Sequence, residues 1–415
     1  MKFNRKIEIV FNHKTTLILD SQSQICNSLY NELLETINQE YKNNPKDATL
    51  LKGRNLRDLI PILKQSKPYL KTVYSSPLKN VAFRLLDAFK EFFKGERGYP
   101  KFRAQKRKWF SLLYDEPFKG YKLKDRQLLL SLGKDKHNKQ IKINGVLKGN
   151  LNLKESDLVK TFRLCKQQGK FYGIFCIERE TPETKEVKTW LAIDPNHKNF
   201  FVGINHKGES IEFEKLTQPK YFDLLIDYLK SKRDKCKKFS KRWRRLNRTI
   251  NRVSYRRREQ IKSLCFTIAN YLAKHYDCVM IGDYSPSVKV APKKNMRRSV
   301  LNQSTISTFR KTLEWVFHRS GKAYKQVDEY NTTKTCCKCG HKKKKNPDIR
   351  EFRCENCNHI LNRDINSSVN IAKKETLLSG SDYVNWDLSH VTYTAKWNYR
   401  QSRILLTGYV TQNVA

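Results

Sequence analysis

Near the start of the chain, the apolar positions follow first a strand pattern and then a helix pattern. Phe3, Ile7, Ile9 and Phe11 fall on one side of an alternating run, which predicts an opening strand. Apolar residues then recur at the spacing of one helix face in two stretches. The first holds Ile25, Leu29, Leu33, Ile37 and Tyr41, and the second, opening at Ser76, holds Val81, Leu85, Ala88, Phe89 and Phe92. We therefore expect a strand followed by two packing helices of one lobe.

A β-rich middle segment and a change of composition mark the main domain boundary. Between about 111 and 180, short apolar runs such as QLLLSLG and KFYGIFCIE are bounded by Gly, Asn and Lys, which predicts a small β-domain that the opening strand can join. The polar stretch ETPETKEVK then precedes a new apolar run at 190–193, and we place the boundary between them. The last residues, 377–415, show no periodicity that predicts an element.

Residues 231–260 form a strongly basic stretch within a longer helical region. They hold fourteen Lys or Arg residues and only two acidic residues. Like charges three or four positions apart destabilise a helix by about 0.2–0.5 kcal/mol per pair, so such a strip indicates bound phosphate. An apolar face downstream, from Ile261 to Leu272, anchors the helix. The side chains expected to contact nucleic acid here are Lys241, Arg242, Arg244, Arg245 and Arg248.

The charge of the whole chain points to the same partner. Its 415 residues, enough for two to four domains, include 84 Lys or Arg and 40 Asp or Glu, for a net charge of +44. A compact fold with this much like charge repels itself unless an anion shares the surface, so we expect a nucleic-acid partner. A membrane surface is the alternative, but no stretch approaches the ~18 apolar residues of a spanning helix, and the start lacks a classical export signal.

A second basic segment, residues 95–110, interleaves cations with aromatic residues. Its sequence, GERGYPKFRAQKRKWF, has the composition of a groove that holds phosphates while rings stack on bases. The alternative is a solvated loop with aromatic side chains tucked beneath it. The nucleic-acid contacts expected here are Lys101, Arg103, Lys106, Arg107 and Trp109.

Four of the eleven cysteines have the spacing of a zinc site. The two Cys-x-x-Cys pairs, separated by fourteen residues, are Cys336 with Cys339 and Cys354 with Cys357. Four thiolates complete a tetrahedral Zn²⁺ sphere and leave no position for a catalytic water, so we expect one structural zinc. Cys337 is an additional thiol, and His341 or His359 are alternative ligands. Clustered cysteines without a secretory signal also indicate a reducing compartment.

The residues after the second cysteine pair resemble a known nuclease family. The run 362–372, NRDINSSVNIA, is similar to the last RuvC motif of TnpB and its relatives, the type V CRISPR effectors and the eukaryotic Fanzor proteins. The run 192–200, AIDPNHKNF, resembles the first motif, on the first strand of an RNase H-like sheet. The basic helices around 240–243, the ribbon TTKTCCKCG and the segment YPKF at 99–102 resemble further parts of the family in the same order. The likeness is strongest over residues 188–373.

The resemblance implies an α/β fold with an RNase H-like (RuvC) nuclease domain that carries a zinc ribbon. Before it, we expect a β-barrel wedge domain into which a helical recognition lobe is inserted. The expected segments are 1–20 for the first wedge strand, 21–112 for the recognition lobe, 113–187 for the wedge, 188–331 for the first nuclease part with basic helices at 220–275, 332–360 for the ribbon, 361–376 for the second nuclease part, and 377–415 for an unassigned tail.

One position departs from the family pattern. A RuvC nuclease holds two Mg²⁺ ions about 4 Å apart with carboxylates from separated parts of the chain, and Mg²⁺ prefers such oxygen ligands. Asp194 and Asp364 match the first and last motifs, but Gly282 stands where the catalytic Glu of the second motif is expected. Either the nuclease is inactive and the chain is an RNA-guided DNA-binding repressor, or the missing carboxylate comes from another part of the chain.

We predict that Glu329 supplies this carboxylate. Residues 323–330 read as a strand neighbouring the one before Gly282, and some TnpB relatives and Fanzor proteins similarly have Gly at that place and Glu before the Thr-x-x-Cys of the ribbon. Asp283 and Asp328 are the alternatives. Because adjacent strand residues point to opposite faces, only one of Asp328 and Glu329 can face the metals. The expected catalytic set is Asp194, Glu329 and Asp364.

The function implied by the resemblance is RNA-guided cleavage of double-stranded DNA. A guide RNA pairs with the target, the protein reads a short flanking motif, and a transposon-associated, Mg²⁺-dependent endonuclease cuts the DNA. The alternatives are a compact type V CRISPR effector, the inactive repressor, or a plain zinc-ribbon nucleic-acid-binding protein. We expect a prokaryotic, cytoplasmic protein that is nucleoid-associated when bound to DNA.

Overall fold

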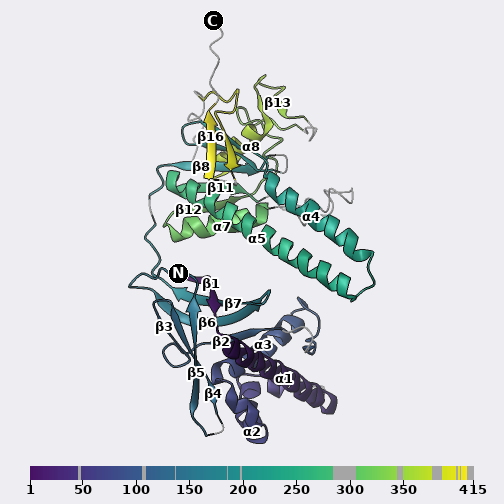
Figure 1. Ribbon diagram of the computed structural model, residues 1–415. Helices are drawn as coiled ribbons and strands as arrows, with labels where there is room; N and C mark the ends of the chain where they lie inside the picture. The colour runs from purple at the N-terminus through teal and green to yellow at the C-terminus, as the bar shows by residue number, and fades with distance from the viewer. Residues whose placement is uncertain are drawn as a thin grey trace. The chain divides into compact units, whose positions relative to one another are not determined.

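The computed structural model describes residues 1–44, 48–104, 109–135, 137–184, 186–196, 199–283, 305–343, 349–375, 386–398, 401 and 403–408. They form two compact units, Met1–Glu180 (unit 1) and Thr181–Ala415 (unit 2) (Figure 1). Each unit contains one seven-stranded sheet and its own helices, so the fold is mixed α/β. Within the described part of the chain, no helix is long and apolar enough to cross a membrane.

The sheet of unit 1 is built around the opening strand. Its order is β2-β6-β7-β1-β5-β4-β3, and β1 pairs antiparallel with β7 along most of its length. The strands are β1 (Lys2–Val10), β2 (Ser111–Tyr114), β3 (Tyr121–Lys124), β4 (Gln127–Lys134), β5 (Gln140–Leu147), β6 (Leu158–Gln167) and β7 (Lys170–Glu178). The expected joining of the first strand to the middle β-rich segment is therefore present.

Three helices share a hydrophobic core with this sheet. They are α1 (His13–Asn43), α2 (Asn55–Ser66) and α3 (Ser75–Phe93). The Asn12 side chain caps α1 by accepting a hydrogen bond from the Thr15 backbone N–H, at 2.7 Å. This cap starts the helix at His13, earlier than the boundary after residue 20 expected from the sequence. Leu29, Leu33 and Ile37 are fully buried, as the four-residue spacing predicts.

The sheet of unit 2 has the order β12-β11-β8-β9-β10-β15-β16. Its strands are β8 (Trp190–Pro195), β9 (Phe201–Asn205), β10 (Ser210–Phe213), β11 (Cys278–Gly282), β12 (Ala323–Val327), β15 (Tyr393–Asn398) and β16 (Arg403–Gly408). Strands β8, β11 and β12 run parallel, so their carboxyl ends meet at one edge. Strands β15 and β16 come from the segment in which the sequence predicted no element.

Helices cover both faces of this sheet. Leu191 and Ile193 of β8 pack with α5 (Lys241–His275) and α7 (Ile306–Arg319), whereas Trp190 and Ala192 pack on the α8 (Arg363–Lys374) side. Successive side chains of a strand point to opposite faces of the sheet, and here both faces are covered by helices. Strand β8 is therefore buried on both faces. Helix α4 (Thr217–Asp234) lies beside α5, joined by Ile226, Ile250 and Val253 (Figure 1). The hairpin β13 (Glu351–Arg353) and β14 (Ile360–Asn362) leads directly into α8.

Candidate active site and metal centre

Asp194 lies at the carboxyl end of β8 and is buried, with 6% of its surface exposed. Burial raises its pKa well above the ordinary aspartate value, and the nearby carboxylates of Glu329 and Asp364 raise it further. The Ser367 side chain, from α8, lies close enough to Asp194 to offset part of this rise in its pKa. The three acids proposed from sequence therefore interact with one another across three separate segments of unit 2.

Glu329 lies two residues beyond the end of β12, and its side chain lies over Gly282. Gly282 pairs with Val327 in the parallel ladder, which brings the ends of β11 and β12 together. A Cβ atom added to Gly282 would lie 1.9 Å from Glu329 Oε1 and 2.5 Å from its Cδ, far inside van der Waals contact. The Glu329 carboxyl thus occupies the space that a side chain at 282 would need.

The two neighbouring acids have other partners. Asp283 Oδ1 accepts a hydrogen bond from the Glu329 backbone N–H at 3.1 Å, so it holds the segment that carries Glu329. Asp328 is exposed and pairs with Lys374 Nζ at 3.4 Å. The backbone N–H of Tyr330 and the Lys374 ammonium lower the Asp328 pKa. Asp328 and Glu329 therefore have different surroundings, although both lie beyond the end of β12, where strand alternation no longer applies.

Asp364 is the second residue of α8 and is also buried. The Asn362 side chain caps this helix by accepting the Asp364 backbone N–H at 2.8 Å. Asp364 Oδ2 accepts hydrogen bonds from Asn196 Nδ2, at 3.2 Å, and from the Arg350 guanidinium. Asn196 and Arg350 were not identified from the sequence. Asn196 is two positions from Asp194, but Arg350 is fourteen residues before Asp364, and only the ribbon fold brings it there.

Two asparagines of α8 hold the start of the ribbon by hydrogen bonds. Asn366 and Asn370, one helical turn apart on α8, donate side-chain hydrogen bonds to the backbone carbonyls of Thr332 and Thr335, at 2.7–3.3 Å. Asn366 Oδ1 also accepts the Cys337 backbone N–H, at 2.8 Å. These bonds fix the segment between Glu329 and the first cysteine pair, so one helix positions both the acidic site and the ribbon.

The four expected zinc ligands come together in the ribbon. Their sulfur atoms all lie within 4.8 Å of one another, the set being Cys336, Cys339, Cys354 and Cys357. His341 and His359 contribute backbone carbonyls, which accept the N–H groups of Cys336 and Cys354. Cys337 is buried apart from this cluster, and burial raises its pKa to about 11. The donor set is the one that Zn²⁺ prefers in closed structural sites.

The three carboxylates are spaced more widely than the four cysteine thiols. Among the described residues, the cysteines are the one set of three or more Cys, His, Asp or Glu donors close enough together to surround a single ion. A site for two ions about 4 Å apart has wider spacing than a cage around one ion. Buried Asp194, whose pKa is raised, suits a divalent, oxygen-preferring cation, because a nearby positive charge favours its ionised form.

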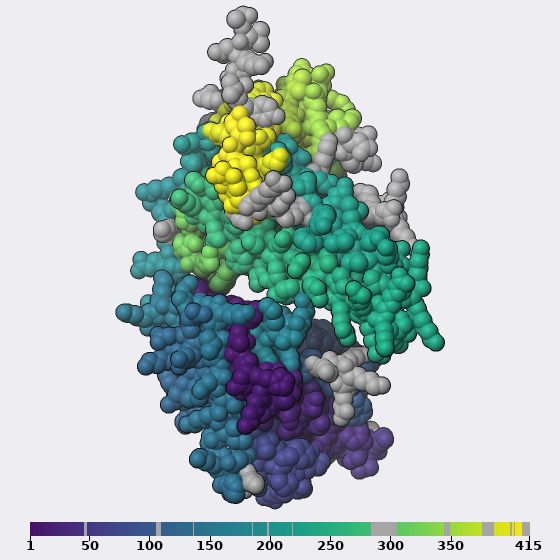
Figure 2. Space-filling model, in the orientation of Figure 1, coloured from purple at the N-terminus to yellow at the C-terminus, as the bar shows by residue number. Residues whose placement is uncertain are grey.

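The expected nucleic-acid contacts have different environments in the two units. In unit 2, the five basic residues at the start of α5 are all exposed, on the helical pair drawn in teal in Figure 2. In unit 1, Lys101 is exposed, whereas the Arg103 guanidinium packs 3.6 Å from the Tyr30 ring centroid and 4.0 Å from that of Trp109. These contacts favour a packing role for Arg103. Lys106 and Arg107 lie outside the described residues.

The chain is similar to several known proteins. Residues 307–371 match the family described as "Cas12f1-like, TNB domain". The TnpB-like protein L79 of Acanthamoeba polyphaga mimivirus is 26% identical over 213 residues, covering 48% of this chain and 40% of that protein. The TnpB-like protein MJ0751 of Methanocaldococcus jannaschii is 26% identical over 191 residues, covering 44% of this chain and 68% of that protein. The chain is similar in sequence to TnpB-like proteins. The resemblance found in the sequence is thereby confirmed.

Two further proteins, one similar in sequence and one similar in structure, match most of the chain. The putative RNA-guided DNA endonuclease InsQ of Escherichia coli (strain K12) is 23% identical over 321 residues, covering 73% of this chain and 75% of that protein. The structure titled "Cryo-EM structure of the Cas12f1-sgRNA-target DNA complex" matches with a TM-score of 0.62 and 13% identity, over 88% of this chain and 83% of that one. The latter likeness shows a shared fold. The chain spans 40% of the length of the viral relatives it matches.

Proposed function

We propose that the chain is a transposon-associated, RNA-guided DNA endonuclease that cuts double-stranded DNA beside a short flanking motif. The observation that carries this proposal is the Glu329 carboxyl over Gly282, in electrostatic contact with Asp194. In this proposal unit 2 is the RNase H-like nuclease domain with its zinc ribbon, and unit 1 is the wedge domain with its helical recognition lobe.

The relatives and the charge support the choice of partners. InsQ is named as a putative RNA-guided DNA endonuclease, and the Cas12f1 structure is a complex with a single guide RNA and target DNA. A net charge of +44 suits a protein that holds an RNA and a DNA strand through their phosphates. Base pairing with the RNA then reads the sequence, so the protein needs a charged channel more than a base-reading helix.

Each residue of the acidic site has a definite role in this proposal. Asp194, Glu329 and Asp364 would hold two Mg²⁺ ions, which supply an activated water and stabilise the departing oxygen when bound. Asp194 and Asp364 are buried, and Asn196 orients Asp364 by donating a hydrogen bond to it. Arg350 balances charge on Asp364. Asp283 fixes the backbone of Glu329 and so positions its carboxyl over Gly282.

The inactive-repressor alternative rested on Gly282 alone. An inactive nuclease that had lost its catalytic Glu would not need another carboxyl beside position 282. The Glu329 carboxyl lies there, and its position therefore favours an active nuclease. A CRISPR effector would use the same chemistry, and gene neighbourhood distinguishes the two. In either case the cysteine quartet would hold one Zn²⁺, which stabilises the ribbon and takes no part in cleavage.

The test is to purify the full chain, sequence the RNA that accompanies it, and assay cleavage of plasmids matched to that RNA beside randomised flanking bases. We expect one enriched structured RNA, and Mg²⁺-dependent cutting of matched plasmids beside one flanking motif. Asp194→Asn should bind RNA and DNA without cutting. Host RNA fragments with no enriched species would contradict the guide, and target binding without cutting by the unmodified chain would support the repressor.

A further inference from the structure

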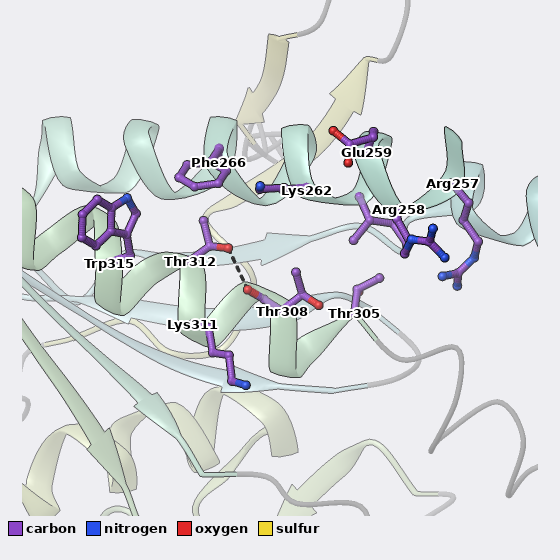
Figure 3. A pocket seen from close by; sticks show the side chains of 11 residues that line it. Arg257, Arg258, Glu259, Lys262, Phe266, Thr305, Thr308, Lys311, Thr312 and Trp315 are labelled. Carbon is purple, nitrogen blue, oxygen red and sulfur yellow. Dashed lines mark hydrogen bonds between the residues drawn. The ribbon is translucent and has the colours of Figure 1, made fainter. Parts of the chain in front are cut away.

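Helices α5 and α7 of unit 2 enclose a groove that neither the acidic site nor the ribbon uses. Its volume is about 580 Å³, within the usual range for pockets that hold small ligands. Figure 3 shows its side chains along the facing sides of the two helices. Trp315 and Phe266 lie toward one end of the view, and Arg257 and Arg258 lie toward the other.

The groove carries a surplus of positive charge. Its lining contains four cationic side chains and one anionic side chain, Glu259. Arg257 is committed to Asp223, with Nε 2.8 Å from Oδ1. Arg258, Lys262 and Lys311 are exposed, and within the described ranges none of them is ion-paired. Because these three cations around the groove have no carboxylate partner among the described residues, they favour binding of an anion.

The aromatic side chains of the groove are held rigidly. Phe266 and Trp315 are half-buried and pack on the core that α5 and α7 share with the sheet. Each therefore presents part of its ring surface to the groove at little cost in conformational entropy. Trp315 and Lys311 also line an adjoining hollow of about 440 Å³, so the groove continues along α7. Cations beside fixed rings are the combination that binds unpaired nucleotides.

We propose that this groove binds an unpaired nucleotide of the RNA that accompanies the protein, which rests on the proposed function. Its phosphate would lie against Arg258 and Lys262, and its base against Phe266 and Trp315. The pocket volume suits a single nucleotide. The Thr308 hydroxyl lines the same groove and can bond a ribose 2′-OH, the group that distinguishes RNA from DNA.

The experiment cross-links the full chain to its co-purified RNA with ultraviolet light and identifies the modified peptides by mass spectrometry. In parallel, RNA affinity is compared between Arg258→Glu and the matched control Arg256→Glu, an exposed residue of α5 that does not line the groove. We expect cross-links at Phe266 or Trp315. We also expect Arg258→Glu to weaken binding at least about tenfold more than Arg256→Glu, because both change net charge equally but only one removes a phosphate contact.

The outcomes separate this inference from the function on which it rests. If RNA accompanies the chain but cross-links only elsewhere, and the two variants weaken binding equally, the groove is not an RNA site while the proposed function stands. If the same peptides cross-link to target DNA in place of RNA, the choice of RNA is wrong. If no discrete RNA accompanies the chain at all, the proposed function fails and this inference fails with it.

Discussion

Gly282 and Glu329 form a pair in which the small residue makes room for the large one. Because a Cβ at 282 would lie 1.9 Å from the Glu329 carboxyl, even alanine must push that carboxyl aside. This packing also gives a structural reason for the Gly that stands at 282 where the family pattern has a catalytic Glu. A lone Gly in place of a catalytic Glu is what an inactive nuclease would have, whereas a Gly covered by another carboxyl is the arrangement that our proposal of a relocated ligand requires.

At the residue scale, we predict that Gly282→Ala slows DNA cleavage by roughly 10–100-fold, the loss typical when the support of a metal ligand is disturbed. The matched control is Gly203→Ala on β9, where the nearest atoms to an added Cβ lie 3.2 Å away. The measurement is the cleavage rate at saturating Mg²⁺. The double variant Gly282→Glu, Glu329→Gly should recover part of the activity, since it returns the carboxyl to β11. A wild-type rate for Gly282→Ala would contradict the packing argument.

The sequence predicted Asp194, Glu329 and Asp364 as the catalytic set, but it did not predict the side chains that contact them. Family motifs and strand alternation can be read from residues close together in the sequence, and both were used to predict the three carboxylates. Arg350 reaches Asp364 only because the β13–β14 hairpin returns the chain to the start of α8, and no sequence period encodes that return. The packing of Arg103 against Tyr30 likewise depends on a contact between distant segments, so a basic, aromatic-rich sequence could not separate surface from packing residues.

At the scale of elements, α8 links the sheet, the acidic site and the ribbon. We predict that Asn366→Ala loosens the segment 332–337, because it removes three hydrogen bonds and leaves the buried Cys337 N–H without its acceptor, a cost of about 1–3 kcal/mol. Amide hydrogen exchange of that segment should accelerate accordingly. The control, Asn251→Ala on an exposed position of α5, should leave this exchange unchanged. Equal protection in both variants would show that α8 does not hold the ribbon.

The ribbon itself provides a second prediction at this scale. Cys354→Ser should lower zinc content below one ion per chain and reduce cleavage with it, because metal binding contributes folding free energy to such a site. Cys337→Ala, which changes a neighbouring thiol outside the cluster, should retain the zinc. Metal analysis of the purified variants decides this. Full cleavage by a zinc-free variant would make the metal incidental.

Long periodic elements were predicted well from the sequence, and short ones were not. The basic helical region expected at 220–275 corresponds to α4 and α5, although α4 begins earlier, at Thr217, and the apolar face from Ile261 to Leu272 is buried as expected. Strands β15 and β16 were missed because the segment 377–415, in which they lie, shows no periodicity that marks a strand. Their place is set by the pairing of β15 with β10, residues about 180 positions apart in the sequence. Such a pairing leaves no local pattern.

At the scale of the whole molecule, the charge of +44 predicts a steep dependence of RNA binding on salt. A plot of log affinity against log salt should lose about 0.7–0.9 in slope for each phosphate contact removed. Replacing the five basic residues at the start of α5 by alanine should therefore flatten the plot. Changing its four arginines to lysine should preserve the slope, because the charge is kept. An unchanged slope in the alanine variant would place the phosphate contacts elsewhere.

The most direct test of the account is the cleavage rate of Glu329→Gln beside Asp283→Asn and Asp328→Asn, on a matched plasmid with Mg²⁺. Loss of a ligand that holds catalytic metal removes several kcal/mol of stabilisation of developing charge, so we predict that Glu329→Gln slows cutting by orders of magnitude while RNA and target binding persist. Asp328→Asn should cut at the normal rate, and Asp283→Asn should cut more slowly because it frees the Glu329 backbone. A wild-type rate for Glu329→Gln together with an inactive Asp283→Asn would contradict the relocated ligand.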